Sequence, residues 1–266
     1  MKDDQFRIYQ SPPSRVFTTD IGQLSREKHY IRTLLEIDIS DSLRALKAVR
    51  TNKNKLSFFS WFIKCIADTV PDHPPLNGIR RGKRTIFVPE SVDISVVVEK
   101  DVKGQSVPLP LILRNAQEKS LVQLNDEIKS AVAQDVQHTG NLVLGSGENR
   151  IFMNLALWIP QKIRLLFMRH ILKNPRRMQE IMGTVMVTSL ATGGRVVGWI
   201  IPTSIHPLSI GVGTISKKTI NLKGVLEKRD ILHLTIAFDH DVIDGMPAKR
   251  FTEALVARLQ SAYGLR

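Results

Sequence analysis

The sequence predicts one globular domain of the mixed α/β class, on two observations. Hydrophobic residues make up 42% and charged residues 24% of the 266 positions, which is the composition of an ordinary folded domain. Segments with the period-2 pattern of strands are mixed along the chain with segments of helical period, and no long Pro-, Gly- or Ser-rich linker divides them. We therefore expect a single domain over residues 1–266.

The first part of the chain is expected to form a strand and two helices. The N-terminal thirty residues show no clear periodicity and are predicted to be extended and irregular. A strand over residues 33–38 precedes a helix with Ser40 as its N-cap. The next helix, over about 57–70, is apolar almost all round, which indicates deep burial.

The rest of the chain adds most of the predicted strands. They are expected at residues 84–88, 93–99, 110–113, 184–189 and 208–215, with a capped helix from about Ser120. A last strand carries Leu232, Leu234, Ile236 and Phe238 on one face, and a helix follows from about Pro247. The short loop between this strand and this helix is the best candidate for a site, because it is held at both ends.

Charge and cysteine content limit the function classes. The formal net charge of +13 suits nucleic acid, anionic lipid, a phosphorylated cofactor or an acidic protein, but the sequence lacks a zinc-finger, aromatic RNA-binding or helix-turn-helix pattern. Cys65 is the only cysteine and lies in an apolar segment, so we expect a buried thiol and neither a disulfide nor a metal site. Without an apolar leader or a membrane-spanning run, a cytoplasmic location is expected.

Three residues of the loop suggest acid–base chemistry. His240 can accept a proton near neutral pH, Asp244 follows four residues later, and Gly245 can supply backbone freedom at the entry into the helix. The spacing alone is weak evidence. From the spacing alone, a histidine that packs the loop and an aspartate at a helix N-terminus are favoured over a catalytic role by about three to one.

The surrounding residues add a family resemblance. The run over residues 238–251 resembles the C-terminal signature of the dihydrolipoyl acyltransferases of 2-oxo acid dehydrogenase complexes, and chloramphenicol acetyltransferase carries a related motif. Residues 36–40, 55–70, 76–77, 111–121, 183–190 and 208–213 resemble further family segments in the family's order. The resemblance implies a chloramphenicol acetyltransferase-like fold, which is a two-layer α/β sandwich with a mixed sheet.

The resemblance also implies a function and its residues. His240 matches the general base that takes the proton of a thiol, and Thr188 matches the hydroxyl residue that binds the oxyanion, with Ser189 as the alternative donor. The implied activity is a coenzyme A-dependent acyl transfer to a thiol or related acceptor, with coenzyme A as substrate or product and no metal. Asp244 and Gly245 would support the histidine loop, and Arg15 would be the ion-pair partner of Asp244.

In this family the active sites lie between the subunits of a trimer. The resemblance therefore implies a homotrimer, or a higher assembly of trimers, in which His240 and Thr188 of one site come from different chains. Acyl-CoA and an acceptor of unknown identity would be its substrates. No lipoyl attachment is expected in this chain, so a separate lipoyl or acyl-carrier domain would be the carrier partner.

The chain also departs from the family pattern. Asp241 and Met246 stand where the family commonly has Arg and Ala, and residues 157–180 form an atypical basic helical insertion. We expect Ile163, Leu166, Phe167 and Ile171 to pack on the core. An acyl-chain pocket, a carrier-docking surface and a contact with anionic membrane lipid remain open as uses of the insertion. The alternative functions are a catalytically idle oligomeric scaffold and, less favoured, a basic nucleic-acid-binding module.

Overall fold

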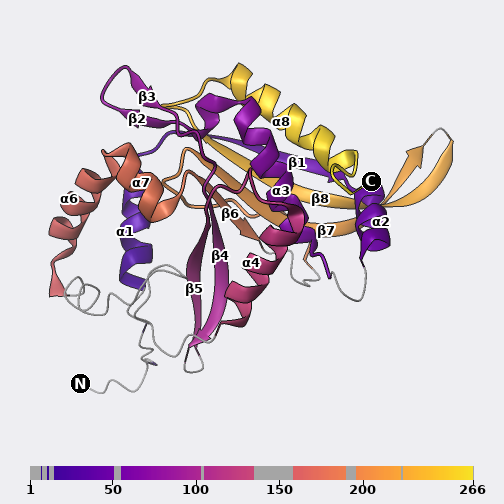
Figure 1. Cartoon of the computed structure of the whole chain (residues 1–266), viewed down its shortest axis with the longest axis horizontal. Helices are drawn as coiled ribbons and strands as arrows, with labels where there is room; N and C mark the ends of the chain where they lie inside the picture. The colour runs from indigo at the N-terminus through magenta and orange to yellow at the C-terminus, as the bar shows by residue number, and fades with distance from the viewer. Residues whose placement is uncertain are drawn as a thin grey trace.

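A six-stranded mixed sheet organises the chain (Figure 1). The computed structural model describes residues 7, 11, 15–50, 55–102, 105–134, 158–189, 196–222 and 224–265, without the side chains of 99–108. The strand order is β1-β8-β7-β6-β4-β5, where β6 runs parallel to both of its neighbours and the other pairs are antiparallel. These strands are β1 (Tyr30–Asp38), β4 (Ile94–Val102), β5 (Gln105–Leu113), β6 (Val185–Ser189), β7 (Leu208–Leu222) and β8 (Val225–Asp239).

Helices cover one face of this sheet. Those that pack there are α2 (Ser40–Val49), α3 (Phe58–Thr69), α4 (Leu121–Ala133) and α8 (Gly245–Gln260). At the other end of the molecule lie α1 (Arg15–Ser25), α6 (Gln161–Leu172), α7 (Pro175–Met182) and the small hairpin of β2 (Ile79–Arg81) and β3 (Thr85–Phe87). The result is the predicted two-layer mixed α/β sandwich.

The core lies between the sheet and α3, α4 and α8. Trp61 and Phe62 of α3 are fully buried there, as the apolar pattern around this helix predicts. Ser57 caps α3 by accepting a hydrogen bond from the Ser60 N–H, and Ser120 forms a capping box with Gln123 at α4. Each cap stabilises its helix by about 1 kcal/mol. Both predicted helix starts are therefore confirmed.

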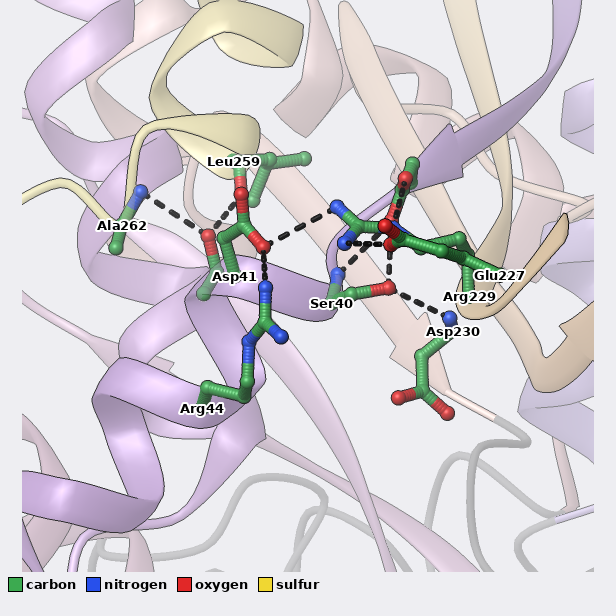
Figure 2. Close-up of polar contacts among 10 residues, drawn as sticks. Ser40, Asp41, Arg44, Glu227, Arg229, Asp230, Leu259 and Ala262 are labelled. Atoms are coloured by element: carbon green, nitrogen blue, oxygen red, sulfur yellow. Dashed lines mark hydrogen bonds and ion pairs between the residues drawn. The ribbon is translucent and has the colours of Figure 1, made fainter. Parts of the chain in front are cut away.

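Ser40 is not the N-cap that the sequence predicts, because α2 already begins at this residue. Its hydroxyl donates to Asp38 Oδ1 at 2.7 Å and accepts from the Asp230 N–H at 2.7 Å, so it joins α2 to β1 and β8 instead. Figure 2 shows the polar cluster around it, in which Arg229 of β8 pairs with Asp38 and Asp41. This cluster fixes α2 against the sheet.

Two more predicted boundaries differ. The N-terminal region expected to be irregular contains α1, whose Asp20 and Leu24 are buried. The last helix, α8, begins at Gly245, two residues before Pro247. Helix α1 has a mixed polar and apolar sequence, and its burial depends on a contact with α6 that is remote in the sequence.

The second face of the sheet is covered by an extended segment, residues 196–207. At Gly211 and Gly213 of β7 an added Cβ would lie 2.3 Å from Ile200 O and 2.4 Å from Gly198 O, so only glycine lets the segment lie so close. Trp199 donates its indole N–H to Leu35 O at 2.9 Å and packs edge-on against the ring of His233. Consequently both faces of β8 are buried from Ile231 to Asp239.

The outer half of the β7–β8 hairpin projects beyond the sheet (Figure 1). The pairing of β1 with β8 stops at Ile231 and that of β6 with β7 stops at Val212, whereas β7 and β8 pair with each other out to Leu222 and Val225. Leu222, Val225 and Leu226 are exposed at its end. An exposed apolar hairpin end is typical of a contact surface.

The basic insertion differs most from its prediction. Residue 157 lies outside the described residues, and the rest forms α6 and α7. No residue of α6 is buried, and Ile163, Leu166 and Phe167 are 53–67% exposed, so the expected packing on the core is wrong for these three side chains. Helix α6 is held against α1 instead, where Arg164 donates to the fully buried carboxylate of Asp20. Within the described residues no helix is long and apolar enough to span a membrane.

Candidate active site

A tight turn carries His240 from the end of β8 toward α8. Asp239, the last strand residue, is 1% exposed, and its carbonyl accepts from the N–H groups of Val242 and Ile243 at 2.9 and 3.0 Å. Its carboxylate forms an ion pair with Lys28 and accepts from the Asp241 N–H. The turn that holds His240 is thus fixed by a buried charged residue with several hydrogen bonds.

The His240 ring lies on the outside of this turn. Its backbone N–H donates to His29 O at 2.6 Å, and half of its side-chain surface is exposed. Nδ1 lies 3.9 Å from Asp244 Oδ1, while Nε2 has no hydrogen-bond partner within the part of the chain that the structure describes. A fixed backbone with an open Nε2 is suited to proton transfer with a bound molecule.

The supporting residues are placed in different ways. Asp244 is the N-cap residue of α8 but makes no capping hydrogen bond, so its exposed carboxylate is left to face His240. Gly245 has no positive φ, and an added Cβ would meet nothing within 4 Å, so the backbone freedom predicted for it is not used. Arg15 is exposed at the start of α1 and makes no ion pair with Asp244 among the described residues.

The family departures Asp241 and Met246 flank the histidine. Asp241 interacts with the partly exposed side chains of His29, at 3.3 Å, and Arg80, at 3.2 Å. Met246 is 59% exposed on the first turn of α8. The acidic residue therefore has a cationic partner in Arg80, and Met246 is an exposed apolar side chain close to His240 in the sequence.

The residues that position this loop were not predicted from the sequence. Lys28, His29 and Arg80 contact it from other parts of the chain. The only sequence signal is the cluster of Asp239 and Asp241 itself, since two acids beside a buried strand end need cationic partners. Which cations supply the charge depends on the tertiary structure.

Thr188 lies near the end of β6 on the face of the sheet away from α3 and α8. Successive strand residues point to opposite faces, and Val187 is fully buried in the core that those helices cover. Thr188 therefore faces the opposite way, and Ser189 shares the face of Val187. Thr188 is partly exposed and pairs with Gly211 of β7, whose missing side chain lets Ile200 pack closely beside it.

The two predicted catalytic residues are far apart within one chain. Thr188 is aligned through Gly211 with Thr235 of β8, and β8 then runs four residues further to Asp239 before His240. At about 3.3 Å per residue along a strand and about 4.8 Å between strands, Thr188 and His240 are separated by roughly 15–20 Å. Two groups at this separation cannot act on the same thioester carbon.

Other titratable groups of the core do not suit catalysis. Burial lowers the pKa of His206 from its usual 6.5 to about 4, and its Nε2–H donates to Met182 O at 2.9 Å. Burial likewise raises the pKa of the Cys65 thiol far above its ordinary value, so the buried free thiol expected from the sequence is confirmed. Among the described residues, no group of three or more His, Cys, Asp or Glu side chains could hold a metal ion.

Comparisons with known proteins identify the class of protein that has this fold and this histidine loop. The family model described as "2-oxoacid dehydrogenases acyltransferase (catalytic domain)" matches residues 25–141 and 174–265. The chain belongs to this family. The residues between the two matched segments include α6, which lies in the predicted basic insertion.

Individual relatives are distant. The lipoamide acyltransferase component of the branched-chain α-keto acid dehydrogenase complex of Bacillus subtilis is 22% identical over 235 residues, which are 86% of this chain and 46% of that protein. The dihydrolipoyllysine-residue acetyltransferase component of the pyruvate dehydrogenase complex of Mycoplasma pneumoniae is 24% identical over 214 residues, 79% of this chain and 43% of that protein. The chain thus spans about half the length of the curated relatives it matches.

Solved structures share the fold. A probable dihydrolipoamide acetyltransferase from Listeria monocytogenes has a TM-score of 0.68 at 19% identity, covering 98% of this chain and 96% of that one. A dihydrolipoamide acetyltransferase of Azotobacter vinelandii, studied for the role of a serine, a histidine and an asparagine in its catalytic mechanism, has a TM-score of 0.67 at 18% identity, covering 99% and 96%. The predicted chloramphenicol acetyltransferase-like sandwich is confirmed.

Proposed function

We propose that this chain transfers an acyl group between coenzyme A thioester and a thiol or related acceptor, with His240 as the general base. The observation that carries the proposal is the His240 turn, in which a buried Asp239 fixes the backbone while Nε2 stays open. Family membership and the catalytic histidine of the Azotobacter vinelandii relative support the same role.

The proposed reaction needs two groups. Nε2 of His240 takes the proton of the acceptor thiol, and the sulfur attacks the carbonyl carbon of the acyl-CoA thioester. The hydroxyl of Thr188 donates a hydrogen bond to the oxyanion of the tetrahedral intermediate. Collapse of the intermediate breaks the bond to the coenzyme A sulfur, and the protonated His240 returns its proton to this leaving group. Asp244 Oδ1, 3.9 Å from Nδ1, stabilises the protonated ring.

Because Thr188 and His240 of one chain lie roughly 15–20 Å apart, we propose that each active site combines residues of two chains. A histidine from a second subunit can approach β6 only from the face away from α3 and α8, where Thr188 is partly exposed, which favours Thr188 over Ser189 as the oxyanion donor. Because cyclic assembly repeats such a contact around a closed ring, we propose a homotrimer. The exposed end of the β7–β8 hairpin is the surface we assign to subunit contact.

The test is a screen of acyl-CoA donors against thiol, hydroxyl and amine acceptors. His240→Ala should lower turnover about 10²–10⁴-fold, because it removes a positioned general base. Thr188→Ala should lower turnover about 10²–10³-fold with little change in KM, since the oxyanion forms only after the substrate is bound. Initial rates of coenzyme A release measure both effects.

The controls use neighbouring residues of the same type. His170→Ala, on α6, and Ser189→Ala, on the other face of β6, should leave turnover within about two-fold, because neither side chain lies in the proposed site. A loss with Ser189→Ala alone would move the oxyanion role to Ser189. Full turnover in His240→Ala would refute the role of His240 as general base, and no acyl transfer by the wild type with any donor would favour an idle scaffold.

A further inference from the structure

Helix α6 presents an unpartnered apolar stripe to the outside. Ile163, Leu166 and Phe167 follow the spacing i, i+3, i+4, which places them on one face of the helix. The side chains of this stripe are exposed, and Trp158, three residues before the helix, is 88% exposed. In Figure 1, α6 lies at the edge of the molecule beside α1 and α7, with no described element beyond it.

A basic border accompanies the stripe. Lys162, Arg169 and Lys173 are spaced at i, i+7 and i+11 and form a row along one side of it. Residues 158–179 contain six Lys and Arg and no Asp or Glu. Two of these cations are used within the fold, Arg164 on Asp20 and Arg169 on Glu27, whereas Lys162 and Lys173 have no ion-pair partner among the described residues.

We infer that α6 binds the surface of an anionic phospholipid bilayer, lying in the plane of the interface. Aromatic and aliphatic side chains on one helix face enter the boundary of the acyl chains, while Lys and Arg beside them bind the lipid phosphates. Trp158 and Phe167 supply the aromatic groups, and Lys162 and Lys173 supply free charge. The helix is too short to cross the bilayer, so the contact is peripheral.

The apolar stripe and its basic border favour a lipid bilayer over two other binding partners, a second copy of the chain and an acidic carrier domain. A second copy in a two-fold contact would bring the same basic row against itself, which is repulsive, and the proposed trimer contact is assigned to the β7–β8 hairpin on the opposite side of the molecule from α6 (Figure 1). An acidic carrier domain would satisfy the lysines but would also have to bury Ile163, Leu166 and Phe167, which are 53–67% exposed on a single helix. A bilayer accepts protruding apolar groups and cations together.

Flotation of the full chain with lipid vesicles tests the inference. At about 0.15 M salt, the protein should float with vesicles of equal parts phosphatidylcholine and phosphatidylglycerol, and not with phosphatidylcholine alone. Leu166→Ser with Phe167→Ser, and separately Lys162→Glu with Lys173→Glu, should each weaken binding at least about ten-fold. Emission of Trp158 should shift to shorter wavelength on binding, and Trp158→Phe should remove that shift.

A matched control separates local contact from net charge. Lys47→Glu with Lys55→Glu makes the same change of charge at exposed sites near α2 and the start of α3, and it should alter vesicle binding less than about two-fold. Circular dichroism and size-exclusion chromatography verify that all variants keep their fold and assembly. Loss of assembly in the Leu166 and Phe167 variant would assign the stripe to a second copy and overturn the inference.

Three further results would also overturn it. These are no flotation with anionic vesicles, equal weakening by the control pair, and saturable binding of an isolated lipoyl domain through Leu166 and Phe167 without vesicle binding. The readout is lipid binding, so its outcome is independent of acyl transfer.

Discussion

His206 and His240 show how the environment assigns different roles to the same side chain. His206 is buried, with Nδ1 on the Ser204 hydroxyl at 2.8 Å and Nε2 on Met182 O, so both ring nitrogens are used within the core. His240 has an open Nε2 on an exposed turn. The sequence cannot separate them, because the neighbours that satisfy or expose a ring come from distant segments.

Acidification should destabilise the protein through His206. Its folded pKa of about 4 lies below the usual 6.5, so between these values the unfolded chain binds a proton that the folded chain excludes. The stability is therefore present above about pH 6.5 and is lost as the pH falls toward 4. Between about pH 7.5 and pH 5 the wild type should lose ~2 kcal/mol more than His206→Gln, measured by urea unfolding at both values. Equal losses in the two proteins would contradict this account.

At the scale of the element, α6 is fastened by a buried charge pair, while the apolar side chains that it turns inward are only half-buried. Asp20 of α1 is fully buried and accepts from Arg164 at 2.7 and 3.1 Å and from Gln161 at 3.1 Å. Removal of one partner leaves a buried charge without compensation, which costs about 3–5 kcal/mol. Because α6 has no buried residue of its own, this loss should detach the helix before the domain unfolds.

Limited trypsin digestion should detect this detachment. In Asp20→Ala, cleavage within α6 at Lys162 or Arg164 should be at least about ten-fold faster than in the wild type. The reason is that trypsin cleaves a locally unfolded segment more readily than an intact helix. The control is Glu27→Ala, which removes the exposed pair between the turn after α1 and Arg169 of α6 and should change the rate little. Mass spectrometry of early fragments locates the cuts. The same rate in both variants would mean that α6 is held by other contacts.

At the scale of the whole molecule, the two proposed catalytic residues lie at the surface of a single chain. Thr188 is on the sheet face away from the helices, and His240 is beyond the end of β8, roughly 15–20 Å away. The buried core supports Thr188 and His240 but does not bring them together within one chain. Activity should therefore belong to the assembly.

Mixed assemblies should recover activity from two inactive variants. If His240→Ala and Thr188→Ala chains are unfolded together and refolded in equal amounts, random assembly gives about one quarter of the sites an intact threonine from one chain and an intact histidine from the other. Turnover should rise from near zero to about a quarter of the wild-type value. Each variant refolded alone is the control. No recovery in mixed assemblies of normal size would place both residues in one site of one chain.

Local patterns predicted a large part of this fold. The alternation in β8, the apolar circumference of α3 and the caps at Ser57 and Ser120 depend on near neighbours, and the structure confirms them. The boundaries of α1 and α8 and the role of Ser40 depended on distant partners and were predicted wrongly. The resemblance around residues 238–251 indicated His240, and its catalytic role stays a prediction.

The sequence by itself determined the class of the protein, the strands and helices of its core and the loop that carries His240. These follow from side-chain periodicity, capping chemistry and a contiguous motif, all of which act over a few residues. Only the tertiary structure decided which cations fix the loop, which face of β6 Thr188 occupies relative to the helices, and that the apolar stripe of α6 points outward. The physical reason is that burial and ion pairing are set by segments far apart in the chain, whose approach no local pattern encodes.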